Sequence, residues 1–127
     1  MTEATKARVD VSGSVRLGEA VTPITGEAAA VLRTLEAKST DGSRVYPEHA
    51  TASLVVTAEP VGKEKAIGIT DHLLGASENH PRDGLPLEFR TDHDEQAERL
   101  TVSLQGSVSA VSYLLFLVHL HMTQSRH

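Results

Sequence analysis

Alternation of apolar and polar side chains predicts four strands in this chain. The clearest run covers residues 9–17, where every second residue is apolar or glycine and the residues between are polar. Residues 51–58 alternate in the same way, as do residues 85–90 and 100–104. The acidic segment 91–98 between the last two strands predicts an antiparallel hairpin. Because each strand has one polar side, we expect a mostly antiparallel sheet with one packed face and one polar face.

Three other segments have apolar residues at helical spacing. The first follows Thr25, an expected N-cap, and should bury Ala28, Val31, Leu32 and Leu35. The second covers residues 63–74 and should end at Gly75, with a buried face made of Ala66, Ile67, Thr70, Leu73 and Leu74. The third covers residues 108–122, and Ser107 is its expected cap.

The predicted order of elements is therefore β-α-β-α-β-β-α, which indicates an α+β fold. We expect a two-layer sandwich in which a mostly antiparallel, four-stranded sheet carries its helices on one face. A chain of 127 residues has the usual length of one domain. We therefore expect a single domain over residues 9–127, preceded by a flexible segment at residues 1–8.

The last predicted helix is the most unusual part of the sequence. It lies in a stretch without formal charge, from Leu100 to Ser125, and its apolar side chains cover almost the whole circumference of the helix. Only Ser109, Ser112 and His119 share a weakly polar stripe. One sheet face cannot cover such a helix, so we expect a second body, such as another subunit, to shield it. The expected interface residues are Tyr113, Leu114, Phe116, Leu117, His119 and Leu120.

Composition narrows the classes of partner and chemistry. The net charge of −5 argues against a nucleic-acid partner, because phosphate binding requires a basic surface. The absence of cysteine excludes disulfides, cysteine-ligated zinc and thiol catalysis. The first residues carry no apolar leader, and the last helix is shorter than the roughly 20 apolar residues that span a bilayer. We therefore expect a cytoplasmic protein without a membrane partner.

Histidine is the one enriched reactive residue type, with seven in the chain. His49, His72 and His93 each follow a carboxylate, but neighbouring residues diverge in a helix and point to opposite faces in a strand. A weak candidate for acid–base chemistry consists of Asp71, His72, Glu78, His80, Arg82 and Asp83. Motifs for a nucleophilic serine, for nucleotide binding and for helical zinc binding are absent.

The two histidines of the last helix do not predict a metal site. His119 and His121 would lie about 200° apart on a helix and could not bind one ion. We expect no metal and no cofactor. At an interface, His119 would make assembly dependent on pH, whereas His121 near the helix end is expected to suit a cation.

The polar face of the predicted sheet is rich in uncharged hydroxyl groups, which could be solvated, contact a second copy or bind a ligand. Its expected residues are Ser12, Ser14, Thr51, Ser53, Thr57, Thr101, Ser103 and Gln105. Together with the apolar last helix, this face favours a small soluble interaction module that forms a homo-oligomer or joins a larger complex through that helix. Two alternatives are a small enzyme that uses histidine and carboxylates near residues 71–84, and a domain that binds a small ligand between the last helix and the sheet.

Overall fold

A computed structural model of the chain describes residues 7–40, 50–79 and 87–123. Within these ranges the chain forms five strands and three helices, in the order ββαβαββα. Their bounds are β1 Arg8–Leu17, β2 Ala20–Glu27, α1 Ala28–Thr40, β3 Thr51–Glu59, α2 Lys63–Asn79, β4 Glu88–Asp94, β5 Arg99–Ser107 and α3 Val108–Thr123. The predicted α+β class is confirmed.

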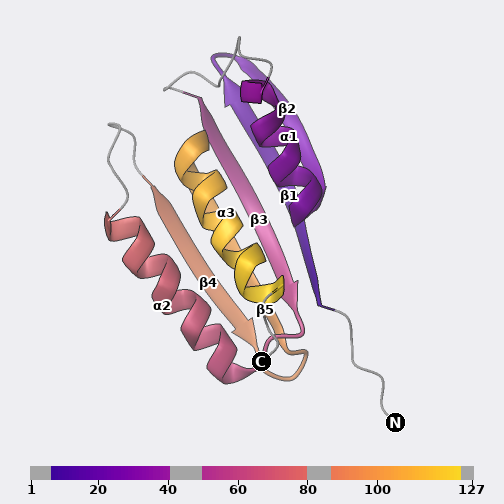
Figure 1. The fold of residues 1–127 in the computed structure, drawn as a ribbon, viewed down its shortest axis with the longest axis vertical. Helices are drawn as coiled ribbons and strands as arrows, with labels where there is room; N and C mark the ends of the chain where they lie inside the picture. Colours follow the sequence, from indigo (N-terminus) through magenta and orange to yellow (C-terminus); the bar gives the residue numbers. More distant parts are fainter. Residues whose placement is uncertain (1–6, 41–49, 80–86, 124–127) are drawn as a thin grey trace.

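The described strands form one antiparallel sheet with the order β2-β1-β3-β5-β4. The helices lie in a second layer over one face of it, with α3 between α1 and α2 (Figure 1). The two-layer arrangement, the antiparallel pairing and the β4–β5 hairpin agree with the sequence prediction. The sheet has five strands in the described residues, so the prediction of four was wrong.

The strand that sequence analysis missed is β2. It folds back on β1 through a turn at Gly18, whose φ of 62° suits glycine. Thr25 is therefore a strand residue rather than an N-cap, and its hydroxyl donates a hydrogen bond to the carbonyl oxygen of Val11 at 3.2 Å. Only Ile24 of this strand is buried, so β2 lacks the alternating apolar pattern that marks a half-buried strand.

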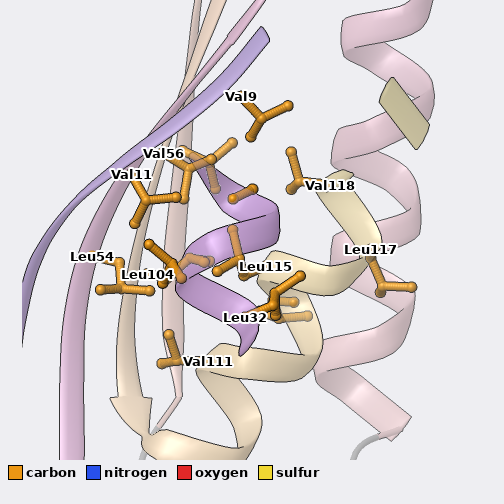
Figure 2. Close-up of a cluster of buried hydrophobic side chains, with 14 of the residues drawn as sticks. Val9, Val11, Leu32, Leu54, Val56, Leu104, Val111, Leu115, Leu117 and Val118 are labelled. Atoms are coloured by element: carbon orange, nitrogen blue, oxygen red, sulfur yellow. The ribbon is translucent and has the colours of Figure 1, made fainter. Parts of the chain in front are cut away.

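The core lies between the sheet and the helices, as the alternating patterns predict. In β3, the buried side chains are Ala52, Leu54, Val56 and Ala58. In β5 and α1, they are Leu100, Val102, Leu104, Ala28, Val31, Leu32 and Leu35. Figure 2 shows strand residues such as Leu54 and Val56 beside Val111, Leu115 and Val118 of α3. The Ser107 cap is also confirmed, since its hydroxyl accepts a hydrogen bond from the amide of Ala110 at 3.3 Å.

The buried face of α2 differs from the prediction. It centres on Ala66, Ile69 and Leu73, whereas the side chains of Ile67 and Leu74 are 53% and 48% exposed. The helix also continues through the predicted stop at Gly75 and ends at Asn79. The buried face was misassigned because the apolar residues of α2 are spread too widely around the helix for the sequence pattern to select one face. The stop was misassigned because Gly75 does not take the positive φ of a C-terminal cap and lies inside the helix.

Gly13 lies in β1, between its cross-strand partners Ile24 of β2 and Leu54 of β3. A Cβ atom at this position would collide with the carbonyl oxygen of Ser53 and the Cα atom of Leu54. Glycine therefore permits the close approach of β1 and β3 under the helical layer.

The two edges of the sheet are formed by β2 and β4. Edge strand β2 carries Pro23 opposite Ser14 of β1. Edge strand β4 carries exposed charged residues at every second position, namely Glu88, Arg90, Asp92 and Asp94. Proline and charged residues are typical of the edges of natural sheets.

Candidate functional site

The inner side of α3 is enclosed by the chain itself. Eight of its 16 residues are buried: Val108, Ala110, Val111, Leu114, Leu115, Leu117, Val118 and Met122. The sheet lies below these residues, and α1 and α2 close the two flanks (Figure 1). Leu114 and Leu117, expected at an interface, are 0% and 4% exposed, so they do not present side chains to a partner. The two flanking helices supply most of the cover that the sequence analysis had assigned to a second body.

The outer side of α3 is covered far less. The side chains of Tyr113 and Phe116 are each 43% exposed, and those of His119 and Leu120 are half-buried. Helical spacing places all four on the side of the helix that faces away from the sheet. We call Tyr113, Phe116, His119 and Leu120 the outer strip. These are the remaining four of the six predicted interface residues, and the structure leaves them accessible to solvent in the single chain.

A pair of histidines joins α2 to α3. The Nδ1 atom of His72 lies 2.8 Å from the Nε2 atom of His121, the ring centroids are 5.0 Å apart, and the ring planes make an angle of 78°. Burial lowers the pKa of His121 below its ordinary value of 6.5, and the nearby charges of His72 and Lys65 lower it further. This disagrees with the expectation that His121 suits a cation, because burial and, after it, the charges of His72 and Lys65 oppose its protonation.

Only part of the candidate acid–base site lies within the described residues. Asp71 and His72 are both exposed on α2, and the hydrogen-bond partner of His72 is His121 rather than a carboxylate. The side chain of Glu78 and the whole of His80, Arg82 and Asp83 lie outside the described residues, as does His49.

His93 has a structural contact. Its Nε2 atom lies 2.7 Å from the carbonyl oxygen of Val61 and can donate a hydrogen bond to it. This bond ties β4 to the segment that leads from β3 into α2, which accounts for the half-buried position of His93. Across residues 7–40, 50–79 and 87–123, no three histidine or carboxylate side chains are grouped to hold a metal ion.

No element among the described residues covers the face of the sheet opposite the helices, and this face is mostly polar, as predicted. None of its eight expected hydroxyl and amide residues is buried. Strand register aligns Ser14, Ser53, Gln105 and Glu88 in one row across β1, β3, β5 and β4. The next row contains Ser12, Val55, Ser103 and Arg90.

Two adjoining hollows lie on this open face, with volumes of 320 and 400 Å³. Both are lined by Ser53, Glu88 and Gln105. Arg16 and Val21 line the first hollow, and Arg90 lines the second. The alternating pattern puts Arg16, Glu88 and Arg90 on the polar sides of their predicted strands, but the sequence analysis did not include them in the open face. Val21 was missed because β2 was not predicted.

Comparison with known proteins adds no family to this picture: no protein-family model, curated protein or solved structure matches the chain. Among the described helices, none has the length and apolar character needed to cross a membrane. Function must therefore be argued from the geometry of the outer strip, the histidine pair and the open sheet face.

Proposed function

We propose that this protein is an interaction module that associates through the outer strip of α3. Its partner is a second copy of the chain or another subunit of a larger complex. The observation that carries the proposal is the exposure of Tyr113 and Phe116 side by side on the outer strip. Aromatic side chains are enriched at protein interfaces and among the residues that dominate binding energy.

The small number of aromatic residues makes this placement more informative. The chain has two phenylalanines and two tyrosines, and the outer strip contains one of each. Both aromatics are among the exposed large apolar side chains, whereas the largest fully buried side chains of the core are aliphatic. Leu120 and His119 extend the same surface toward the end of α3.

The size of the strip indicates what else a stable complex needs. Burying the exposed parts of two aromatic side chains contributes about 2 kcal/mol each, at roughly 25 cal/mol per Å². Association costs at least about 4 kcal/mol in lost rotational and translational freedom. The strip therefore acts as the centre of a larger interface that also includes neighbouring surfaces of α1 or α2.

The test is the solution mass of the purified protein over a range of concentrations. We expect a mass above that of one chain, and we expect the double variant Tyr113→Ser/Phe116→Ser to have the mass of one chain. Val55→Ser is the matched control, since Val55 is 44% exposed on β3, on the sheet face opposite the helices and away from the outer strip. Unchanged association in the double variant would contradict the proposal.

The two forms of the proposal are separated by a second measurement. Stable interfaces of ordinary size have dissociation constants far below about 200 μM. If the wild-type chain still has the mass of one protomer at about 200 μM, the homo-oligomer is excluded. Site-specific photo-cross-linking in cells from position 116, with position 55 as the control, then tests for a different partner. Equal cross-linking from both positions would exclude a specific role of the outer strip.

A second candidate function is the binding of a small polar ligand on the open sheet face. The observation in its favour is the pair of adjoining hollows that share Ser53, Glu88 and Gln105. The space between α3 and the sheet, where a ligand was first expected, is occupied by core side chains (Figure 2). The neutral floor and the flanking Arg16, Glu88 and Arg90 suit an elongated ligand with hydroxyl groups or separated charges of opposite sign.

Native mass spectrometry of the purified protein tests this second function. A retained small molecule that is lost in Ser53→Val/Gln105→Ala would support a site on the sheet face. A retained molecule that survives this double variant, or the absence of binding across a panel of polar metabolites, would contradict it. The Tyr113→Ser/Phe116→Ser variant should leave ligand binding unchanged, so the two functions are separable.

A further inference from the structure

The geometry of the histidine pair between α2 and α3 shows which kind of interaction joins the two rings. The Nδ1 atom of His72 and the Nε2 atom of His121 are 2.8 Å apart, while the ring centroids are 5.0 Å apart. The distance between the centroids exceeds the distance between the nitrogens by about twice the length from a ring centroid to a ring nitrogen. This is the result expected when both nitrogens lie on the line between the centroids. The nitrogens therefore face each other head on, which is the geometry of a single N–H···N hydrogen bond.

The same geometry argues against a shared metal ion. An ion held by both histidines would lie about 2.0–2.1 Å from each nitrogen, with both lone pairs directed at one point. With tetrahedral angles at the ion, the two nitrogens would stand about 3.3 Å apart and both would lie off the line between the ring centroids. Head-on nitrogens leave room for one proton and not for an ion.

We propose that His72 and His121 form a proton-operated clasp, which holds α2 against α3 above neutral pH and opens when both rings become protonated. In the neutral pair, one ring donates its N–H and the other accepts through its lone pair. A first added proton preserves the bond only if it binds the nitrogen of the donor ring that faces away from the partner ring. The N–H of the donor ring then still faces the lone pair of the other ring. A second added proton places two N–H groups and two positive charges in opposition, so the bond is lost.

The groups around the clasp favour this behaviour. The charges that act on His121 come from His72 and Lys65 of α2, and both oppose its protonation. The inward side chains that α1, β1, β3 and β5 direct toward α3 are apolar. Glu64 and Asp71 are exposed on α2, and His119 is the other titratable histidine of the described part of α3. The lowered pKa of His121 agrees with a pair that resists a second proton.

The sign of the effect on stability follows from the direction of that shift. In the unfolded chain His121 binds a proton with an ordinary pKa of 6.5, whereas in the folded chain its pKa is lower. The unfolded state therefore binds more protons between these two values. The contribution of the clasp is complete above pH 6.5 and is lost as the pH falls through the folded pKa.

The clasp adjoins the outer strip, because His121 directly follows Leu120 along α3. Opening it would loosen α2 beside the strip and alter the surface available for association. The clasp itself does not depend on the proposed function, since both histidines belong to one chain. It can therefore be tested on the dilute protomer.

The experiment measures stability by chemical denaturation between about pH 8 and pH 5, the range in which histidine titrates. The key variant is His72→Asn/His121→Gln, in which the amide groups stand near the positions of the two ring nitrogens but do not titrate. We expect the wild type to lose stability on acidification and this variant to lose less. His119→Gln is the control: it removes a histidine of α3 that is outside the clasp and should keep the wild-type pH dependence.

Nuclear magnetic resonance of the histidine ring protons gives an independent readout. We expect the pKa of His121 to lie below 6.5 in the wild type and to rise toward 6.5 in His72→Asn, because one source of repulsion is removed. Each unit of pKa corresponds to a tenfold change in the proton-binding constant. Amide protection in α2, corrected for intrinsic exchange, should fall on acidification in the wild type only.

The possible outcomes are distinct. Equal pH dependence in the wild type and His72→Asn/His121→Gln, or an unshifted pKa of His121, would overturn the clasp. A confirmed clasp in a chain that does not associate would leave this inference intact and contradict only the homo-oligomer form of the proposed function.

Discussion

The inner and outer sides of α3 differ both in polarity and in what covers them: the inner side is aliphatic, whereas the outer side carries Ser109, Ser112 and His119 beside its aromatic residues. On the inner side, Leu114, Leu115 and Val118 are fully buried between the sheet and the two flanking helices. On the outer side, Tyr113 and Phe116 remain 43% exposed. The hydrophobicity of a helix sets how much surface it must hide, and its neighbours cover the side that faces the core. The inner side of α3 serves the fold, and we propose that the outer side binds a partner.

The largest expected effect is on the inner side. Leu114→Ala should lower the free energy of unfolding by about 2–5 kcal/mol, because it removes buried methyl groups and leaves a cavity. Phe116→Ala, on the outer side, should lower it by less than about 1 kcal/mol in the dilute protomer, since nearly half of that side chain is already in water. Chemical denaturation at low protein concentration measures both. Equal losses would show that the two sides of α3 do not differ in the way the structure indicates.

A smaller loss is expected from a change in the sheet beneath the inner side. Gly13→Ala introduces a Cβ atom that meets the carbonyl oxygen of Ser53, so β1 and β3 must move apart. We expect a loss of about 1–3 kcal/mol, typical of an overpacked site, with the same antiparallel fold. Ser12→Ala is the control, because Ser12 is exposed on the open face. A neutral Gly13→Ala would mean that the two strands do not need their close approach.

The smallest expected effect has the opposite sign and concerns the outer side of the helical layer. Gly68 is exposed within α2, and a Cβ atom there would meet nothing within 4 Å. Gly68→Ala should therefore stabilise the protomer by about 0.4–1 kcal/mol, because alanine has less conformational entropy to lose. Thermal unfolding of the dilute chain measures this gain. A loss of stability would show that α2 needs glycine at this position for a reason within the single chain.

Much of the fold could be predicted because its strands alternate around a common core. Leu54 and Val56 or Leu100 and Val102 have polar neighbours at every second position, which identifies both the strand and its buried face. The cap at Ser107 and the four buried residues of α1 were also identifiable, since they depend on local spacing. These features need no knowledge of distant contacts.

The remaining features depend on contacts between elements distant in sequence. Strand β2 lies on the edge of the sheet with a single buried residue, so local hydrophobicity could not reveal it. His72 and His121 are 49 residues apart and meet only because α2 and α3 pack side by side. The same packing explains why Leu114 and Leu117 belong to the core, while Tyr113 and Phe116 do not.

The edges of the sheet have a consequence for how copies of this chain can assemble. A neighbouring strand that approached β2 would meet Pro23, and one that approached β4 would meet Glu88, Arg90, Asp92 and Asp94. Both features discourage strand-by-strand growth into open-ended fibres. A two-fold pair in which both copies use the outer strip would instead be finite, because its contact uses up the same surface on each copy.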